Sequence, residues 1–379
     1  MATPKIDIPA SPNTVKVSII DTTTRMSSIG AGPFFTPPIK GYEKMSNSPS
    51  YSFLIQHTAS GTTRSLLFDL GLRKDWRNLP PVLVGAIDAM GWEMEIEKDV
   101  SDILTQGGVD PNTIEAIIWS HYHMDHIGDS SRFGPSTAVM FGPGVKESLL
   151  PGYPANPGAF LLESDYAGRE AVELDFSSDS TGPKKWRTLQ IGGFRAIDVF
   201  EDGSFYLLDS PGHAIGHICG LARISSGSGG GGEANKDVFL LMAGDSFHHG
   251  GVIRPSLYLP IPDDKTVDYK GVSCPCTLFK SVLPHGDETR PFFEPTITGT
   301  EAHSFHHDSK EALRTIEKLQ KFDAQDNVFV VAAHDGTILD TVDLFPAQVN
   351  AALIRAWDEK VRWRFLADFA EAAGQPASR

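Results

Sequence analysis

Three histidines and one aspartate fall within six consecutive positions, 121–126, which read HYHMDH. Imidazole and carboxylate are good ligands for zinc and, to a lesser degree, for iron, manganese or cobalt. In an extended backbone, side chains two positions apart point the same way, so His121, His123 and Asp125 can converge while His126 faces another direction. The stretch therefore predicts ligands for two adjacent metal ions.

The alternative for this stretch is a solvated polar loop. Against that alternative, an apolar and β-branched run at 113–120 lies directly upstream, and Gly128 permits a turn downstream. The histidines are thus expected on a loop that leaves a buried strand. A structural zinc site is disfavoured, because such sites normally close with four cysteine or histidine ligands and no cysteine pair lies nearby.

Three further candidate ligands stand where other predicted strands end. His213 follows a Pro-Gly corner after one strand, and it is predicted as a fourth histidine ligand. Asp245 comes just after a buried apolar run, where a dry and unpaired carboxylate is costly, so it is predicted to bridge two cations. His334 ends the last apolar run and would complete the ligands of a second metal.

Other histidines are assigned different roles. His217 is expected to support the ligands through hydrogen bonds. His248 is predicted to line the pocket as a hydrogen-bond donor to substrate, and His249 is expected to be a neighbour without direct chemistry. Three more histidines read as a polar loop with no fixed spacing to the ligands: His303, His306 and His307.

Strands must position these residues, and the apolar runs predict them at 15–20, 51–55, 65–69, 113–120, 138–141, 194–200, 205–209, 218–224, 238–243 and 327–333. Helical patterns occupy 81–90, 100–106, 145–149, 308–322 and much of 346–373. Asp69 ends a strand before a glycine and is expected to prop a neighbouring loop. The aromatic segment 22–50 is either a pocket wall or a packed surface loop, and the region 133–180 is assigned to substrate shape.

Composition and charge restrict the class of protein. The 379 residues are 40% hydrophobic and 21% charged, which is typical of a globular chain with a large core. A net charge of −15 opposes a nucleic-acid partner. The three cysteines read as reduced thiols, and neither a signal peptide nor an apolar run of membrane-spanning length is seen. We expect a soluble cytoplasmic protein, with a homodimer possible.

The assembled pattern resembles the metallo-β-lactamase superfamily. It consists of HxHxDH, then PGH, GD and HD, each at the end of an apolar strand. The resemblance implies an α/β fold, an αββα sandwich of two mixed β-sheets flanked by helices, in three segments: a lead-in at 1–14, a catalytic domain at 15–345 and a helical extension at 346–379. It implies two Zn²⁺, one held by His121, His123 and His213 and the other by Asp125, His126 and His334, with Asp245 bridging.

Within the superfamily, the chain looks most like the dinuclear N-acyl-homoserine lactonases and related fungal lactone or lactam hydrolases. Those lactonases commonly carry a tyrosine three residues after the bridging aspartate, whereas this chain has His248. The implied reaction is attack by a metal-bound hydroxide on a small cyclic ester or cyclic amide, such as an N-acyl-homoserine lactone or a benzoxazolinone-type ring. The implied catalytic residues are Asp125, Asp245 and His248.

Other functions share the same motifs. A thioester hydrolase of the glyoxalase II or polyketide-releasing type is one alternative, and a metal-stabilised binding protein without activity is another. A redox di-iron protein is disfavoured, because such members usually carry a glutamate where this chain has His123.

Overall fold

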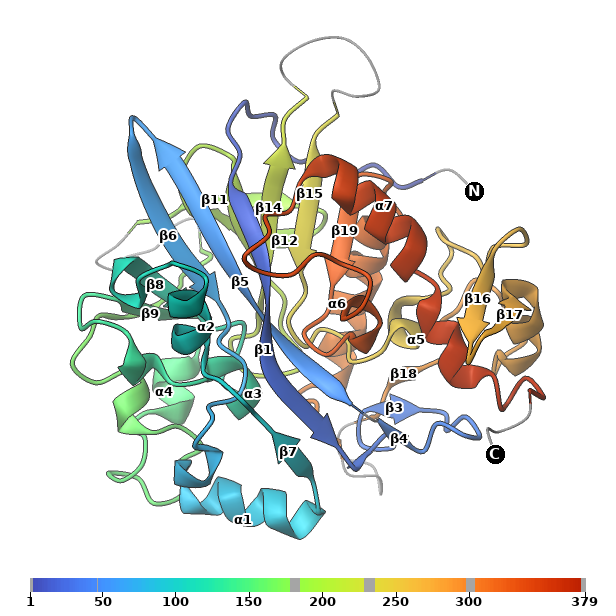
Figure 1. Cartoon of the computed structure of the whole chain (residues 1–379), viewed down its shortest axis with the longest axis horizontal. Helices are drawn as coiled ribbons and strands as arrows, with labels where there is room; N and C mark the ends of the chain where they lie inside the picture. Colours follow the sequence, from blue (N-terminus) through green and yellow to red (C-terminus); the bar gives the residue numbers. More distant parts are fainter. Residues whose placement is uncertain (1–2, 46, 178–184, 228–235, 298–303, 376–379) are drawn as a thin grey trace.

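The protein is represented by a computed structural model that describes residues 3–45, 47–177, 185–227, 236–297 and 304–375. Two β-sheets form its centre (Figure 1). In spatial order, the seven-stranded sheet contains β10 (Ala171–Glu173), β9 (Ala138–Phe141), β8 (Ile114–Ile118), β6 (Thr62–Phe68), β5 (Ser48–Ala59), β1 (Lys16–Ser27) and β7 (Glu93–Glu95). The six-stranded sheet contains β11 (Arg187–Ile191), β12 (Phe194–Asp198), β13 (Phe205–Asp209), β14 (Ile218–Ser225), β15 (Val238–Met242) and β19 (Val328–Val331).

Both sheets are mixed. In the first sheet, β5 pairs antiparallel with β6 and β1, whereas β6, β8 and β9 run parallel. In the second, the strands from β11 to β15 alternate in direction, and β19 adds parallel to β15. Because β13, β15 and β19 consequently run the same way, their carboxyl ends meet at one edge of the sheet.

Apolar side chains from both sheets fill the space between them. Phe53 and Ile118 from the first sheet belong to the same buried cluster as Leu207, Leu240 and Phe329 from the second. Burial of this kind is the main favourable contribution to folding. The two sheets therefore form a sandwich around one continuous core.

Helices cover the two outer faces. The first sheet is covered by α2 (Val100–Gln106) and α4 (Val145–Leu149), whose Leu104 and Val145 join its outer cluster. The second is covered by α6 (Ser309–Asp323) through Ile316 and Leu319. The Asp308 carboxylate caps α6 by accepting hydrogen bonds from two backbone N–H groups, at the start of the helical pattern predicted for 308–322. The αββα architecture inferred from the motifs is thus confirmed.

Smaller elements complete the chain: α1 (Pro81–Met90), α3 (Met124–Ile127), α5 (Gly250–Ile253), α7 (Ala351–Val361), β2 (Ile29–Gly30), β3 (Phe35–Thr36), β4 (Lys44–Met45), β16 (Thr266–Tyr269), β17 (Val272–Pro275) and β18 (Glu294–Pro295). Short 3-10 helices include η1 (Trp76–Asn78) and η8 (Arg364–Phe369). The C-terminal helix α7 packs beside β19 (Figure 1), and its Trp357 belongs to the cluster between the sheets. The three predicted segment boundaries stay a prediction.

Several elements differ from the sequence-based expectation. The first strand continues to Ser27, past a register shift between Asp21 and Arg25, although 22–50 was expected to be a loop. Pairing with β5 and β7 stabilises this polar extension, and a single-strand pattern cannot show pairing partners. The C-terminal helix begins only at Ala351, where Asn350 caps it. His303 lies outside the described residues. Within the described part of the chain, no helix is long and apolar enough to cross a membrane.

Candidate metal centre

The HYHMDH stretch combines a loop with a single helical turn. It leaves β8, and α3 begins directly after His123. Because the backbone turns helical at Met124, Asp125 does not continue the alternation of an extended chain. It groups with His126 instead of with His121 and His123. The expectation from extended geometry was therefore wrong about which side chains share a direction, whereas the grouping implied by the family resemblance matches the structure.

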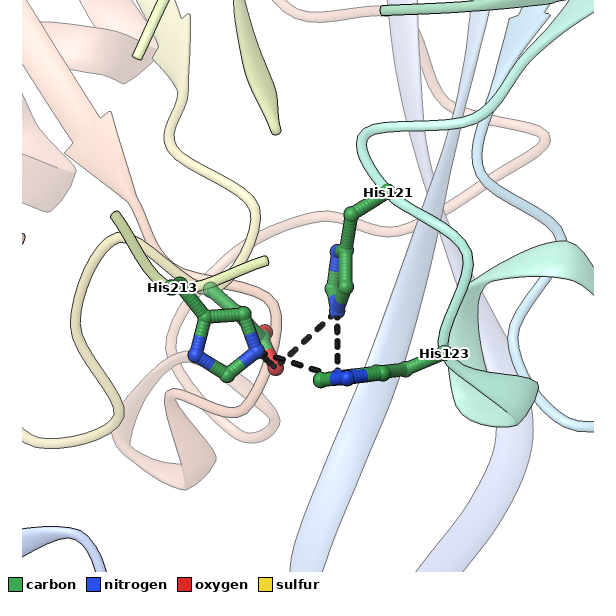
Figure 2. A group of neighbouring side chains, drawn as sticks. His121, His123 and His213 are labelled. Carbon is green, nitrogen blue, oxygen red and sulfur yellow. Dashed lines mark hydrogen bonds and ion pairs between the residues drawn. The ribbon is translucent and has the colours of Figure 1, made fainter. Parts of the chain in front are cut away.

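Three imidazoles converge at the first group. His123 Nδ1 lies 2.9 Å from His121 Nε2 and 3.0 Å from His213 Nε2. Figure 2 shows the three rings pointing toward one another from two segments of the chain. Asp245 Oδ2 lies 3.5 Å from His213 Nε2 and 3.8 Å from His121 Nε2. Nitrogen atoms of three rings thus face one small volume.

These three imidazoles are in the form that binds metal. Burial, together with neighbouring imidazoles, lowers the pKa of His121 and of His213 well below the ordinary value. Burial lowers the pKa of His123 to about 4, although Asp125 and Asp245 oppose the shift. All three rings are neutral at pH 7, so their lone pairs are available to a cation.

The second group is held together by charge. His334 Nε2 lies 3.3 Å from Asp125 Oδ2 and 3.2 Å from Asp245 Oδ1, and His126 Nε2 lies 3.2 Å from the same Asp245 oxygen. Burial opposes protonation of His334, but Asp245 and Asp125 outweigh it and raise its pKa to about 10. Burial also opposes ionisation of Asp125, but His126 and His334 lower its pKa to about 2. Two carboxylates therefore stabilise positive charge at this position.

Asp245 faces both groups. Its Oδ2 is directed to the first group and its Oδ1 to the second. Asp245 Oδ1 and His126 Nε2 are buried and have no well-formed hydrogen bond to the described residues. Unsatisfied buried polar atoms are costly, and a cation between them would remove much of that cost. The donor set of five histidines and two aspartates fits two divalent metal ions that share Asp245.

A supporting layer orients the ligands. Asp69 directly follows β6 and has a positive φ of 60°. It accepts a hydrogen bond from the Ser120 amide at 2.6 Å and lies 2.9 Å from His126 Nδ1. These contacts confirm the prediction that Asp69 supports a neighbouring loop. His217 Nε2 accepts a hydrogen bond from the Asp245 amide at 3.0 Å, which confirms the predicted support through hydrogen bonds and fixes the backbone of Asp245.

His248 contacts the bridging carboxylate directly. Its Nε2 lies 3.0 Å from Asp245 Oδ2, and its ring is stacked 5.8 Å from that of His334. A carboxylate can only accept, so Nε2 carries the hydrogen and donates it to Asp245. The hydrogen that was expected to reach substrate is therefore donated to Asp245. His249 instead caps α5 through Gly251, as a neighbour without direct chemistry.

His306 was not foreseen near the site. It is buried, its ring lies 5.4 Å from that of His213 and 6.0 Å from that of His248, and its Nε2 lies 3.3 Å from the Phe34 carbonyl oxygen. A polar surface loop was therefore the wrong expectation for His306. Only the apolar neighbour Phe305 hinted at burial. His307 is exposed, and its amide donates to the His213 carbonyl oxygen.

A cavity of about 360 Å³ opens from this centre. His123, Asp125, His213, Asp245, His248 and His334 lie at its inner end. Its other walls are almost entirely apolar and include Phe34, Leu83, Met90, Trp92 and Phe305. Among the described residues, the lining contains no lysine or arginine. The expected pocket wall is confirmed for the aromatic segment, and Phe160 from the region assigned to substrate shape also lines the cavity.

Comparisons with known proteins agree with this geometry. Residues 46–334 match the family described as Metallo-beta-lactamase superfamily. The chain is 42% identical over 371 residues to "Gamma-lactamase FDB1" of Fusarium pseudograminearum, with 97% of this chain and 85% of that protein covered. It is 39% identical over 373 residues to "Cytochrome P450 monooxygenase mpaDE'" of Penicillium brevicompactum, covering 97% of this chain but only 39% of that longer protein. The crystal structure of B. thuringiensis AiiA with N-decanoyl-L-homoserine bound shares the fold, with a TM-score of 0.53, 15% identity, and 89% of this chain and 100% of that chain covered.

Proposed function

Because the chain belongs to the metallo-beta-lactamase superfamily and is a metal-dependent hydrolase, we propose that it opens the ring of a small, uncharged cyclic ester or cyclic amide with two zinc ions. The observation that carries the proposal is that Asp245 faces both His/Asp groups at the inner end of an apolar cavity. The name of the 42% identical relative, a gamma-lactamase, supports a cyclic amide as the substrate. The ligand named in the AiiA structure, N-decanoyl-L-homoserine, supports a cyclic ester as the substrate.

The ligand sets follow from the two groups. His121, His123 and His213 would hold one ion, Asp125, His126 and His334 would hold the other, and Asp245 would touch both. Such a pair of ions, when bound, supplies an activated water nucleophile at neutral pH and polarises the scissile carbonyl. Imidazole and carboxylate donors fit zinc, although iron, manganese or cobalt use the same donors.

The chain's own residues have distinct tasks in ring opening. Asp125 lines the cavity and is ionised at neutral pH, so its carboxylate can accept the proton of the attacking water and return it to the leaving oxygen or nitrogen. His248 donates to Asp245 and fixes the rotation of that carboxylate. The apolar walls exclude bulk water from the reacting carbonyl, which strengthens the electrostatic interactions at the site.

The cavity lining favours this function over thioester hydrolysis. Glutathione and carrier-bound acyl thioesters bring charged groups, which proteins commonly recognise with arginine or lysine. The described cavity lining offers neither. An uncharged ring with an apolar substituent leaves no charge to compensate, so lactones and lactams fit the walls better.

Metal analysis combined with a substrate panel tests the proposal. We expect about two zinc ions per chain, and turnover of N-hexanoyl-homoserine lactone, benzoxazolinone or a simple γ-lactam in preference to S-lactoylglutathione. Exposed Asp268 provides a control: Asp268→Asn should keep the metal content and rates that Asp125→Asn loses. Faster thioester cleavage would overturn the substrate class, and a protein that binds zinc but opens no ring would favour the binding-protein alternative.

The remaining expectations stay predictions. They are a cytoplasmic location, the absence of nucleic-acid and membrane partners, and a possible homodimer.

A further inference from the structure

One wall of the cavity is tied to the rest of the fold by main-chain hydrogen bonds. The Phe34 carbonyl oxygen accepts from the Thr296 amide at 3.2 Å, and the Gly32 carbonyl oxygen accepts from Thr296 Oγ1 at 2.6 Å. The Phe305 amide also donates to the Pro33 carbonyl oxygen at 3.2 Å. The aromatic segment around Phe34 is thus held in place, and its contribution to the cavity is fixed.

The opposite wall, α1, is attached far more loosely. Figure 1 shows this helix at the lower edge of the molecule, next to β7. Ile87 is its only buried residue, while Val82 and Met90 are 41% and 40% exposed. Within the described part of the chain, the hydrogen bonds and ion pairs of α1 reach only residues that flank it in sequence: Arg77, Pro80, Gly91 and Trp92.

The side chains of α1 are divided between two faces. Leu83, Ala86, Ile87 and Met90 line the cavity, at the i, i+3, i+4, i+7 spacing of one helical face. The other face, which includes Ala89, is exposed to solvent. The helix therefore presents a continuous apolar stripe to the space in front of the metal centre.

The same helix is coupled by packing to the metal-bearing turn. Ile87 belongs to a small apolar cluster with Leu72, Leu79 and Met124. Met124 also lines the cavity and directly precedes Asp125 in α3. A group that contacts α1 in the cavity thus packs against the same apolar cluster as Met124, the residue before Asp125.

We propose that α1 is the specificity element of this site, and that it recognises an apolar substituent carried by the substrate beyond the reacting ring. This inference rests on the proposed function and names the part of the substrate that the fold selects. A cavity of about 360 Å³ lies within the range that holds drug-sized ligands, so a bare five-membered ring would leave most of the apolar wall without contact. Each methylene that reaches the wall should lower KM by about fourfold until the cavity is full.

A matched pair of substitutions on α1 tests the inference. Ala86→Phe places a ring inside the cavity, while Ala89→Phe places the same ring on the exposed face of the same helix. The measurement is kcat/KM for homoserine lactones with acyl chains from two to ten carbons. For Ala86→Phe we expect the ratio between the longest and the shortest chain to fall at least tenfold, chiefly through KM. For Ala89→Phe the ratio should equal that of the wild type, and equal ratios in both variants would overturn the inference.

A binding measurement separates this inference from the proposed function. N-decanoyl cyclopentylamide has no ring ester to open, and Trp92 in the cavity wall should report its binding by a change in fluorescence, a change that Trp92→Phe removes. Binding that Ala86→Phe weakens at least tenfold supports the role of α1 even if no lactone is opened. Should Ala86→Phe fail to fold, Leu83→Ala replaces it: this variant should shift the preference toward bulkier substituents, and an unchanged preference would overturn the inference.

Discussion

The residues at the inner end of the cavity are buried and closely positioned, whereas the helix at its outer wall is largely exposed. At the inner end, His121, His213 and Asp245 are buried, and each is positioned by further hydrogen bonds or by neighbouring imidazoles. At the outer wall, α1 is largely exposed and rests on a small apolar cluster. Ligands for a metal must hold their geometry closely, whereas a wall that contacts apolar substituents needs only shape and hydrophobicity.

The difference suggests a division of labour between chemistry and selection. Substitutions at the inner end should abolish the reaction for every substrate. Substitutions at the outer wall should instead change which substrates are accepted. Substitutions at each end of the cavity test that division.

Removing the bridging carboxylate should have the largest effect. Asp245→Asn keeps the shape of the side chain but removes the charge shared by the two groups. We expect kcat/KM to fall at least as far as the ~10²–10³-fold lost when one oxyanion donor is removed, equally for short and long substrates. Steady-state kinetics and zinc content measure this effect. A selective loss for one chain length would contradict the division between the two ends.

Asp69→Asn should have a smaller effect at the same end. The substitution weakens the contact with His126 Nδ1 but leaves every proposed ligand in place. Loss of such a supporting partner typically costs about 10–100-fold in metal affinity. Zinc competition with a chelator gives the affinity directly. Wild-type affinity would show that Ser120, which also contacts the His126 ring, orients it sufficiently on its own.

The buried carboxyl group of Asp165, which lies 3.8 Å from the Arg73 guanidinium, should make stability depend on pH. Burial raises the pKa of Asp165 to about 7, although the Leu162 amide and Arg73 oppose the shift. The folded protein therefore binds this proton more tightly than the unfolded chain, so stability should fall as the pH rises from about 4 to about 7. Asp165→Asn should remove that part of the pH dependence. Urea denaturation at pH 5 and pH 8 measures it, and an unchanged slope would refute the assignment.

The smallest effect is expected in the middle of α1. Gly85 has a helical backbone, and an added Cβ would meet no atom within 4 Å. Gly85→Ala should stabilise the helix by up to about 1 kcal/mol, because glycine loses more backbone entropy on folding. Hydrogen exchange of the α1 amides detects this local change. A loss of zinc in this variant would show that the outer wall and the inner end are not independent.

Most of the framework could be predicted from the chain alone. Apolar runs located both halves of the β5–β6 hairpin, β8, and the strands that precede His213, Asp245 and His334. The extension of β1 was missed, because its polar residues are stabilised by pairing with β5 and β7 and not by their own pattern. The burial of His306 was missed for a related reason: its neighbours come from segments distant in the chain.

The sequence by itself determined which side chains were available for metal chemistry and where strands would end, because residue type and hydrophobic periodicity are local properties. Only the tertiary structure decided which of those side chains come together in space. His213 meets His123 across 90 positions of the sequence, and His334 meets both Asp125 and Asp245. The tertiary structure likewise decided which face of α1 meets the cavity. Grouping in space depends on contacts between segments tens to hundreds of residues apart, and local patterns do not contain them.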